Sequence, residues 1–247
     1  MTGDLHLPEG GEVHIWTVAL DGVDDAAEAR MLSADELDRA RRFRLERDGR
    51  RFVAFHAALR RLLGAYLRVD PKSVRFVPPS PDGKPRLADD SSRLSFNGSR
   101  SQDLGVFAVA HDRMLGIDVE RIREDVALEA LARRVLTPDE LRACSRLEPG
   151  ARRAVFYRSW TRKEAGLKAR GIGLTMAPNE VDVRGDTVEL PAPGSADRPS
   201  GPSMVFSLHD VEVGAGFVAT LAVEGTLPDP PTMCGPVPPL CGARRAR

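Results

Sequence analysis

The sequence predicts an α+β fold, because helix and strand patterns alternate within one chain of 247 residues. Residues 50–68 place apolar side chains at helical spacing, and residues 152–170 continue for several turns without a proline. Residues 115–120 alternate strictly between apolar and acidic side chains, which is typical of a strand. The order strand, helices, strands also occurs twice, although the two halves share little sequence.

The first half begins with a predicted strand at 12–20, which is rich in β-forming residues. A helix then begins at Ser33, where Glu36 completes a capping box, and continues through Arg44. A second helix follows at 50–68, then a short strand at 74–77, a turn-rich loop and the stretch 94–101. We expect the arginines of these helices to form a basic rim.

The second half is predicted to begin with a β-hairpin, formed by strands at 106–110 and 115–120 around an exposed turn that contains His111. Helices follow at 126–134, after Thr137, and at 152–170, where Gly171 ends the long helix. Strands are expected at 180–183, 187–190, 204–210 and 217–223. The predicted organisation is a flexible N-terminus at 1–11, halves at 12–111 and 112–225, and a Pro-rich disordered tail at 226–247.

Composition sets broad limits on function. Lys plus Arg equals Asp plus Glu at 36 each, so net charge indicates no polyanionic partner. Cys144, Cys234 and Cys241 lack the spacing of a disulfide framework or of a zinc site. No apolar stretch is long enough to cross a bilayer, and no signal peptide is recognisable, so we expect a soluble, cytoplasmic protein.

Two stretches carry charged residues in patterns that suggest catalytic chemistry. On the long helix Trp160, Glu164 and Lys168 lie four residues apart on one face. A Glu–Lys pair at this spacing is usually a surface ion pair. Asp118 and Glu120 share one face of the strand at 115–120, where they either face solvent or hold a hard cation such as Mg²⁺ or Mn²⁺.

Together the two stretches resemble the signatures of the 4′-phosphopantetheinyl transferase superfamily. They read Gly-Ile-Asp-Val-Glu at 116–120 and Trp-Thr-Arg-Lys-Glu-Ala-Gly-Leu-Lys at 160–168. Their order and separation, and the chain length, are similar to those of the larger, Sfp-type branch that activates polyketide and peptide synthetases. The resemblance implies an intramolecular pseudo-dimer of two similar α/β halves, with the active site in a cleft between them.

The resemblance also implies an activity, namely transfer of 4′-phosphopantetheine from coenzyme A to a serine of an acyl or peptidyl carrier protein. Asp118, Glu120 and Glu164 would hold Mg²⁺ or Mn²⁺, with Glu164 and Lys168 as catalytic residues. Adenosine 3′,5′-bisphosphate would be the by-product. A monomer that needs neither nucleic acid nor membrane is expected.

Contacts with coenzyme A are implied at seven positions: Arg39, Arg51, Lys84, Ser99, Arg100, Lys163 and Lys168. The chain departs from the family pattern at Glu36, where relatives often have a basic residue, and at Arg100, which replaces a histidine. Gly98 and Gly166 replace larger residues and are expected to loosen their surroundings.

Two alternatives remain from the sequence. The departures would suit a degenerate relative that binds coenzyme A or carrier protein with little transferase activity. The arginine-rich helices would suit a nucleic-acid-binding domain, but this leaves the acidic residues unexplained and lacks an aromatic stacking platform.

Overall fold

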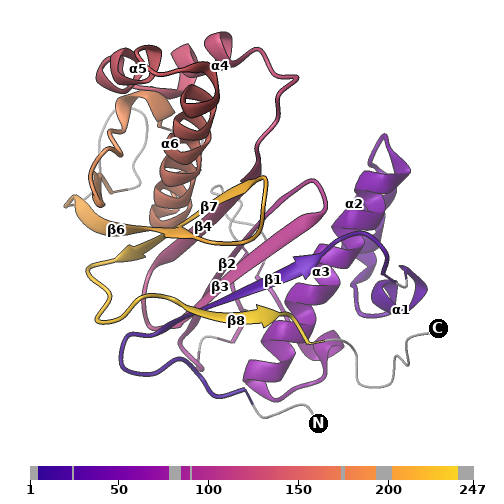
Figure 1. Ribbon diagram of the computed structural model, residues 1–247. Helices are drawn as coiled ribbons and strands as arrows, with labels where there is room; N and C mark the ends of the chain where they lie inside the picture. Colours follow the sequence, from indigo (N-terminus) through magenta and orange to yellow (C-terminus); the bar gives the residue numbers. More distant parts are fainter. Residues whose placement is uncertain are drawn as a thin grey trace.

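The molecule contains two four-stranded sheets. The computed structural model describes residues 5–23, 25–77, 85–89, 91–173, 176–192 and 202–238. In the first sheet the strand order is β2-β3-β1-β8, and in the second it is β4-β7-β6-β5 (Figure 1). The strands are β1 (Val13–Ala19), β2 (Leu94–Ser101), β3 (Leu104–His111), β4 (Leu115–Arg121), β5 (Thr187–Leu190), β6 (Met204–Val211), β7 (Phe217–Glu224) and β8 (Thr232–Pro236).

The two halves share one strand order. In the first half, β3 lies between β2 and β1 and pairs antiparallel with both. In the second half, β7 lies between β6 and β4 and pairs antiparallel with both. Each half also has one helix of 22 residues, α3 (Glu46–Leu67) and α6 (Pro149–Arg170). The α+β prediction is confirmed, and the shared order is that of two similar halves.

The elements stack in four layers, with the two sheets between α3 and α6 (Figure 1). One apolar cluster joins α3 to the first sheet and includes Trp16, Phe55 and Leu62. A second cluster fills the space between the sheets, and a third joins α6 to the second sheet. Strand alternation explains this, because Ile15 faces the second sheet whereas its neighbour Trp16 faces α3.

The smaller helices pack against the long ones. They are α1 (Asp25–Ala29), α2 (Ala34–Arg41), α4 (Leu128–Val135), α5 (Pro138–Ser145) and the 3₁₀ turns η1 (Pro71–Ser73) and η3 (Pro178–Glu180). The predicted capping boxes at Ser33 and Thr137 are both present. Gly49 lies inside α3 rather than before it. Its missing side chain leaves room for the Ala40 carbonyl oxygen, which a Cβ there would meet at 2.8 Å.

Five predictions about the strands and the ends are wrong. β3 and β4 belong to different sheets and form no hairpin, since the chain crosses from one layer to the other between them. Residue 180 ends a 3₁₀ turn and residues 181–183 are irregular chain. Residues 74–77 contribute only the bridge from Phe76 to Leu87. Residues 5–11 are not loose, because Leu5 and Leu7 pack against the first core.

The fifth correction concerns the predicted tail. Thr232–Pro236 forms β8, which pairs parallel with β1 at the edge of the first sheet. Val237 follows it into the core and is 6% exposed. The prolines do not prevent this, because an edge strand tolerates a missing N–H donor.

Among the described helices, none combines the length and apolar character that a bilayer crossing requires.

Candidate active site

The two sheets meet where the edge strands β2 and β4 lie side by side. No ladder joins them; instead, side chains of β2 accept hydrogen bonds from backbone groups of β4. The amide of Ile117 donates to Asn97 Oδ1 at 2.9 Å, and the amide of Arg121 donates to Ser101 Oγ at 3.0 Å. Strand alternation places Asn97, Ser99 and Ser101 on this seam.

Both strand carboxylates are held by serines across the seam. Ser99 Oγ donates to Asp118 Oδ1 at 2.8 Å, and Ser101 Oγ donates to Glu120 Oε2 at 2.7 Å. Asp118 is 4% exposed, and its second oxygen, Oδ2, is buried without a hydrogen-bond partner among the described residues. An unpartnered buried carboxylate oxygen is costly, so this atom is suited to a cation.

Helix α6 brings the other two groups to the seam. Gly116 makes this possible, because a Cβ there would lie 2.2 Å from the Ala165 carbonyl oxygen and 2.4 Å from the Ala169 amide nitrogen. With the helix this close, Lys168 Nζ donates to Asp118 Oδ1 at 2.6 Å and to Ser99 Oγ at 3.1 Å. The predicted face of the helix therefore does meet the predicted face of the strand.

Glu164 lies one turn before Lys168 and is half-buried. Burial raises the pKa of Glu164 above its ordinary value, and the charge of Asp118 raises it further. The pKa of Glu120 is raised by burial and by the charges of Asp118 and Glu164, against a hydrogen bond from Ser101. Three carboxylates thus face one ammonium, and this excess of negative charge favours binding of a further cation.

The three carboxylates are near one another but not as tightly grouped as ligands of one ion. Within the described ranges, the only acidic or histidine triad whose ligand atoms all lie within 4.8 Å of one another is His6, Glu12 and His14, in the first half. Binding of one ion by Asp118, Glu120 and Glu164 therefore requires side-chain rotation. The ion would also replace part of the contact between Lys168 and Asp118.

A group of arginines lies on the other face of β2. The Arg100 guanidinium is 5.8, 5.9 and 6.0 Å from the ring centres of Phe43, Phe52 and Phe55, and Arg39 lies 5.4 Å from that of Phe52. Burial lowers the pKa of Arg100, as do the neighbouring arginines, despite the charge of Asp48. Neither Arg39 nor Arg100 forms an ion pair with a carboxylate in the described part of the chain.

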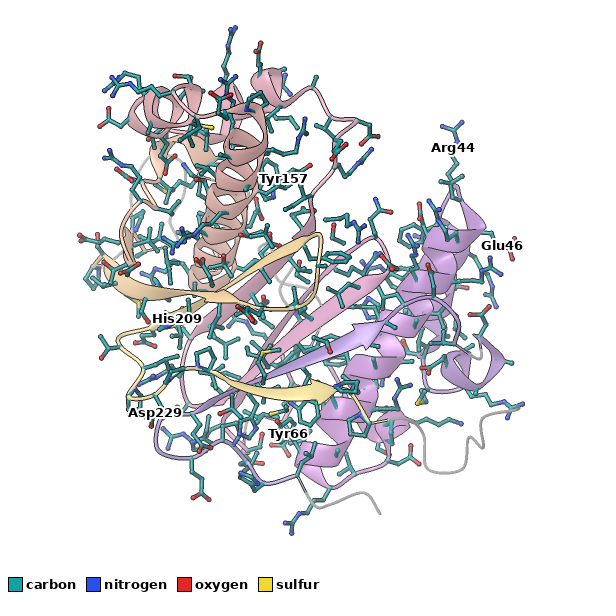
Figure 2. The ribbon with its side chains drawn as sticks, in the orientation of Figure 1. Arg44, Glu46, Tyr66, Tyr157, His209 and Asp229 are labelled. Carbon is teal, nitrogen blue, oxygen red and sulfur yellow. The ribbon has the colours of Figure 1, made fainter. Side chains whose placement is uncertain are left out.

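The arginine group therefore has unused capacity for an anion. A cavity of about 290 Å³ lies beside it, lined by Arg39, Arg42 and Phe43. Nearby, Arg44 and Glu46 mark the tip where α2 leads into α3, and their side chains point away into solvent (Figure 2).

Arg51, one of the predicted coenzyme A contacts, is already neutralised by an ion pair. Arg51 is 7% exposed and donates two hydrogen bonds to Asp21, at 2.8 and 2.6 Å. Its guanidinium is close enough to Arg100 to affect the pKa of that residue, but its charge is balanced.

Lys163 is the clear error among the predicted site residues. Its side chain is 1% exposed and points away from the seam, where Nζ lies 2.6 Å from Glu140 Oε2 and donates to the Pro178 and Val181 carbonyl oxygens. It joins α6 to α5 and η3, and a phosphate has no access to it. The sequence did not reveal this, because Lys163 adjoins Glu164 but lies on another side of the helix.

The departures from the family pattern have structural explanations. Glu36 accepts hydrogen bonds from the Ser33 amide and from Arg60. Although burial opposes it, hydrogen bonds from His56, Ser33 and Arg60 lower the pKa of Glu36 to about 2. Gly98 lies in a strand and not in a loop, and a Cβ there would meet Phe107 at 2.7 Å, so aromatic rings fill the space that a larger side chain would take. Lys84 lies outside the described residues.

A second hollow of about 440 Å³ continues along the seam beyond Lys168. Ser95 and Phe96 of β2 line one side of it, and Ala169, Arg170 and Gly171 at the end of α6 line the other. The seam therefore offers space for a molecule longer than a phosphate group. Sequence reasoning missed Gly116, Asn97 and Ser101 as contributors, although the two-residue spacing of Asn97, Ser99 and Ser101 could have indicated one polar strand face.

Comparisons with known proteins agree with this geometry. Residues 114–222, which include all three carboxylates and Lys168, match the model of the 4′-phosphopantetheinyl transferase superfamily. The chain is 43% identical over 167 residues to the 4′-phosphopantetheinyl transferase HetI of Nostoc sp., covering 66% of this chain and 70% of that protein. It is 32% identical over 179 residues to a phosphopantetheinyl transferase of Thraustochytrium sp., covering 66% and 62% of the two chains.

The structure of holo-[acyl-carrier-protein] synthase from Thermotoga maritima is more distant. It matches 45% of this chain and 63% of its own, with 22% identity and a TM-score of 0.31.

Proposed function

Because the chain belongs to the 4′-phosphopantetheinyl transferase superfamily, we propose that its seam transfers 4′-phosphopantetheine from coenzyme A to a serine hydroxyl of a carrier protein. The observation that carries this proposal is the meeting of two distant motifs. Two elements meet around Ser99: strand β4 brings Asp118 and Glu120, and helix α6 brings Glu164 and Lys168.

The side chains at the seam fit a divalent cation. Within the described part of the chain, Oδ2 of Asp118 is buried without a hydrogen-bond partner. The pKa values of Glu120 and Glu164 are raised by burial and by the neighbouring carboxylates. All the ligand atoms would be carboxylate oxygens, which suit Mg²⁺ and also Mn²⁺. We propose that Asp118, Glu120 and Glu164 hold Mg²⁺, which when bound offsets the negative charge of the pyrophosphate.

Lys168 is proposed to stabilise the leaving group. In the transfer, the serine oxygen forms a bond to the β-phosphorus of coenzyme A, and the bond from that phosphorus to the oxygen bridging to the α-phosphate breaks. Negative charge then develops on adenosine 3′,5′-bisphosphate. The ammonium of Lys168, held between Ser99 and Asp118, offsets that charge and can supply a proton.

Glu164 is proposed to accept the serine proton. Its carboxylate has no hydrogen-bond partner among the described residues, and burial followed by the charge of Asp118 raises its pKa toward the range useful for a base. A carboxylate that also binds a cation is a weaker base, so the proton passes to Glu164 through a water molecule.

The arginine group is proposed to bind the phosphates of coenzyme A. Arg39 and Arg100 have planar donors and no competing carboxylate in the described part, and they lie beside the 290 Å³ cavity. Because Arg100 cannot act as a base near neutral pH, its role is binding. Ser99 then has the role of positioning Asp118 and Lys168. The chain is proposed to act as a monomer, because each half supplies part of the site.

Intact-mass spectrometry of an apo carrier protein tests the proposal directly. Incubation with coenzyme A and Mg²⁺ should add one phosphopantetheine group per carrier. Glu164→Gln and Asp118→Asn should each slow the transfer by at least about a hundredfold. Glu148→Gln is the matched control, because Glu148 is an exposed carboxylate that precedes the same helix.

The outcomes separate the transferase from a degenerate binding relative. Transfer that needs divalent metal and is lost in both seam variants supports the proposal. Binding of coenzyme A without transfer to any carrier in a broad panel would support the degenerate relative. Equal loss in Glu148→Gln would show that the variants act through folding.

A further inference from the structure

A cluster of two histidines and a glutamate lies at the start of β1, away from the seam. Ligand atoms of His6, Glu12 and His14 all lie within 4.8 Å of one another. Glu12 and His14 are two residues apart, so the strand places their side chains on the same face, and His6 approaches from the preceding segment. His6 and His14 meet edge to face, with ring centres 5.5 Å apart.

His14 is held in the orientation that a metal ligand needs. The residue is 5% exposed, and its Nδ1 lies 2.7 Å from the hydroxyl of Tyr66. Trp16 Nε1 donates to the same hydroxyl at 2.9 Å, which fixes the phenol in turn. Tyr66 is carried by α3 and lies beside β1 and β8 in Figure 2. A ligating histidine usually binds an outer partner through its other ring nitrogen, and Tyr66 provides that partner.

The other ring nitrogen faces the carboxylate. Nε2 of His14 lies 3.5 Å from Glu12 Oε2, which is close to the separation of two ligand atoms on one four-coordinate ion. The carboxylate is anchored by a turn, in which the Glu9 amide donates to Glu12 Oε2 at 3.4 Å and the Glu12 amide donates to the Glu9 carbonyl oxygen at 2.9 Å. Gly10 and Gly11 have φ values of +60° and +93°, which other residues rarely adopt.

Space for a further ligand adjoins the cluster. A cavity of about 780 Å³ is lined by His6, Glu9 and Tyr66, among other residues. Three protein ligands with one open position form the arrangement in which zinc retains a water molecule.

We propose that His6, Glu12 and His14 form a second metal site, which binds a zinc-class divalent transition ion. Imidazole nitrogens suit zinc, cobalt, nickel or copper and disfavour magnesium, so this site and the carboxylate seam select different metals. A bound ion would tie the segment before β1 to the strand and thereby stabilise the first half. The inference does not depend on the proposed transferase function.

The site is structurally separate from the seam. His14 and Trp16 lie on the face of the first sheet that is covered by α3, whereas Asp118 lies on the second sheet and faces α6. The cysteine spacing in the sequence indicated no zinc site. The ligands here are histidine and glutamate, which become neighbours through a turn and a strand.

Cobalt binding provides a direct test. The full chain is stripped with a chelator and titrated with Co²⁺ in excess Mg²⁺, which occupies oxygen-only sites. We expect one Co²⁺ per chain, with the visible absorption of a four- or five-coordinate ion. His6→Ala and Glu12→Gln should weaken this binding at least tenfold, and Tyr66→Phe by about tenfold. Glu148→Gln and His111→Ala are matched controls, since both residues are exposed and lie outside the triad and its cavity.

A thermal measurement distinguishes folding effects from binding. Zn²⁺ at roughly a hundredfold above Kd should raise the Tm of the native chain by several degrees, and His6→Ala should lose that rise while keeping its metal-free Tm. His6 is exposed, so its removal leaves the core intact. Cobalt binding that persists in His6→Ala and Glu12→Gln, or that is abolished by Asp118→Asn, would overturn the proposal. An absence of binding to the native chain would do the same.

Discussion

Replacing Gly116 by alanine should damage the active site without touching a charged group. The added Cβ would lie 2.2 Å from the Ala165 carbonyl oxygen and 2.4 Å from the Ala169 amide nitrogen. Both are backbone atoms of α6 and cannot rotate away. Because an ordinary carbon–oxygen contact is about 3.2 Å or more, β4 and α6 must separate by roughly 1 Å.

That separation acts on both stability and catalysis. Overpacking of a well-filled core typically costs about 1–3 kcal/mol, and a clash with two backbone atoms belongs at the upper end of that range. The same displacement moves Lys168 away from Asp118, from which it is now separated by 2.6 Å. A misplacement of about 1 Å can lower a rate by about a hundredfold.

Gly166→Ala is the matched control, because it makes the same substitution in α6 itself. A Cβ there would meet Val188 Cγ1 at 3.3 Å and Leu190 Cδ1 at 3.4 Å, which are side-chain atoms able to shift. Alanine also gains about 1 kcal/mol of helix propensity over glycine. We expect the stability of this variant to stay within about 1 kcal/mol of the parent, with little change in transfer rate.

Urea unfolding and the kcat/KM for transfer to an apo carrier protein measure both effects. We expect a large loss of both quantities in Gly116→Ala and a small change in Gly166→Ala. A Gly116→Ala variant with native unfolding free energy and native kcat/KM would refute this prediction. Equal losses in the two variants would show that the helix as a whole, rather than its contact with β4, limits activity.

Three further predictions concern single charges. Glu140→Gln leaves the buried ammonium of Lys163 without its counter-ion and should lower the unfolding free energy by about 3–5 kcal/mol, while transfer per folded molecule stays native; a selective rise in the KM for coenzyme A would instead place Lys163 in the binding site. The pKa of Glu36 is about 2, against an ordinary 4.5, so its stabilisation is present above pH 4.5 and is lost as pH falls toward 2. The unfolding free energy of the parent chain should therefore fall by about 3 kcal/mol across that pH window, and Glu36→Gln should remove this fall. An unchanged pH profile in the variant would contradict the lowered pKa of Glu36. Arg100→Ala should raise the KM for coenzyme A about tenfold or more with a smaller change in kcat, and an unchanged KM in steady-state kinetics would remove Arg100 from the phosphate site.

Much of the local structure was predictable because its causes are local. The capping boxes of Ser33 with Glu36 and of Thr137 with Glu140 use hydrogen bonds that span three residues. The two long helices and most strands follow from the period of their apolar side chains. The motif at 116–120 and that at 160–168 were also recognisable, because each lies within one element.

The arrangement of the site depended on contacts between distant residues. Lys168 and Asp118 are fifty positions apart, and their meeting requires the close approach that Gly116 allows. Lys163 and Lys168 are both lysines of one helix, but only Lys168 points to the seam. Lys163 instead forms an ion pair with Glu140 of α5. Arg51 was a plausible phosphate ligand until its pairing with Asp21 was seen.

The sequence by itself determined the fold class, the repeated order of elements, the family and the four charged residues at the seam. The tertiary structure alone decided that β3 and β4 enter different sheets, that residues 232–236 add an edge strand, and that His6, Glu12 and His14 converge. The reason is physical. Helical period and caps are fixed by neighbours in the chain, whereas strand pairing, burial of a charge and ligand geometry are fixed by partners that only folding brings together.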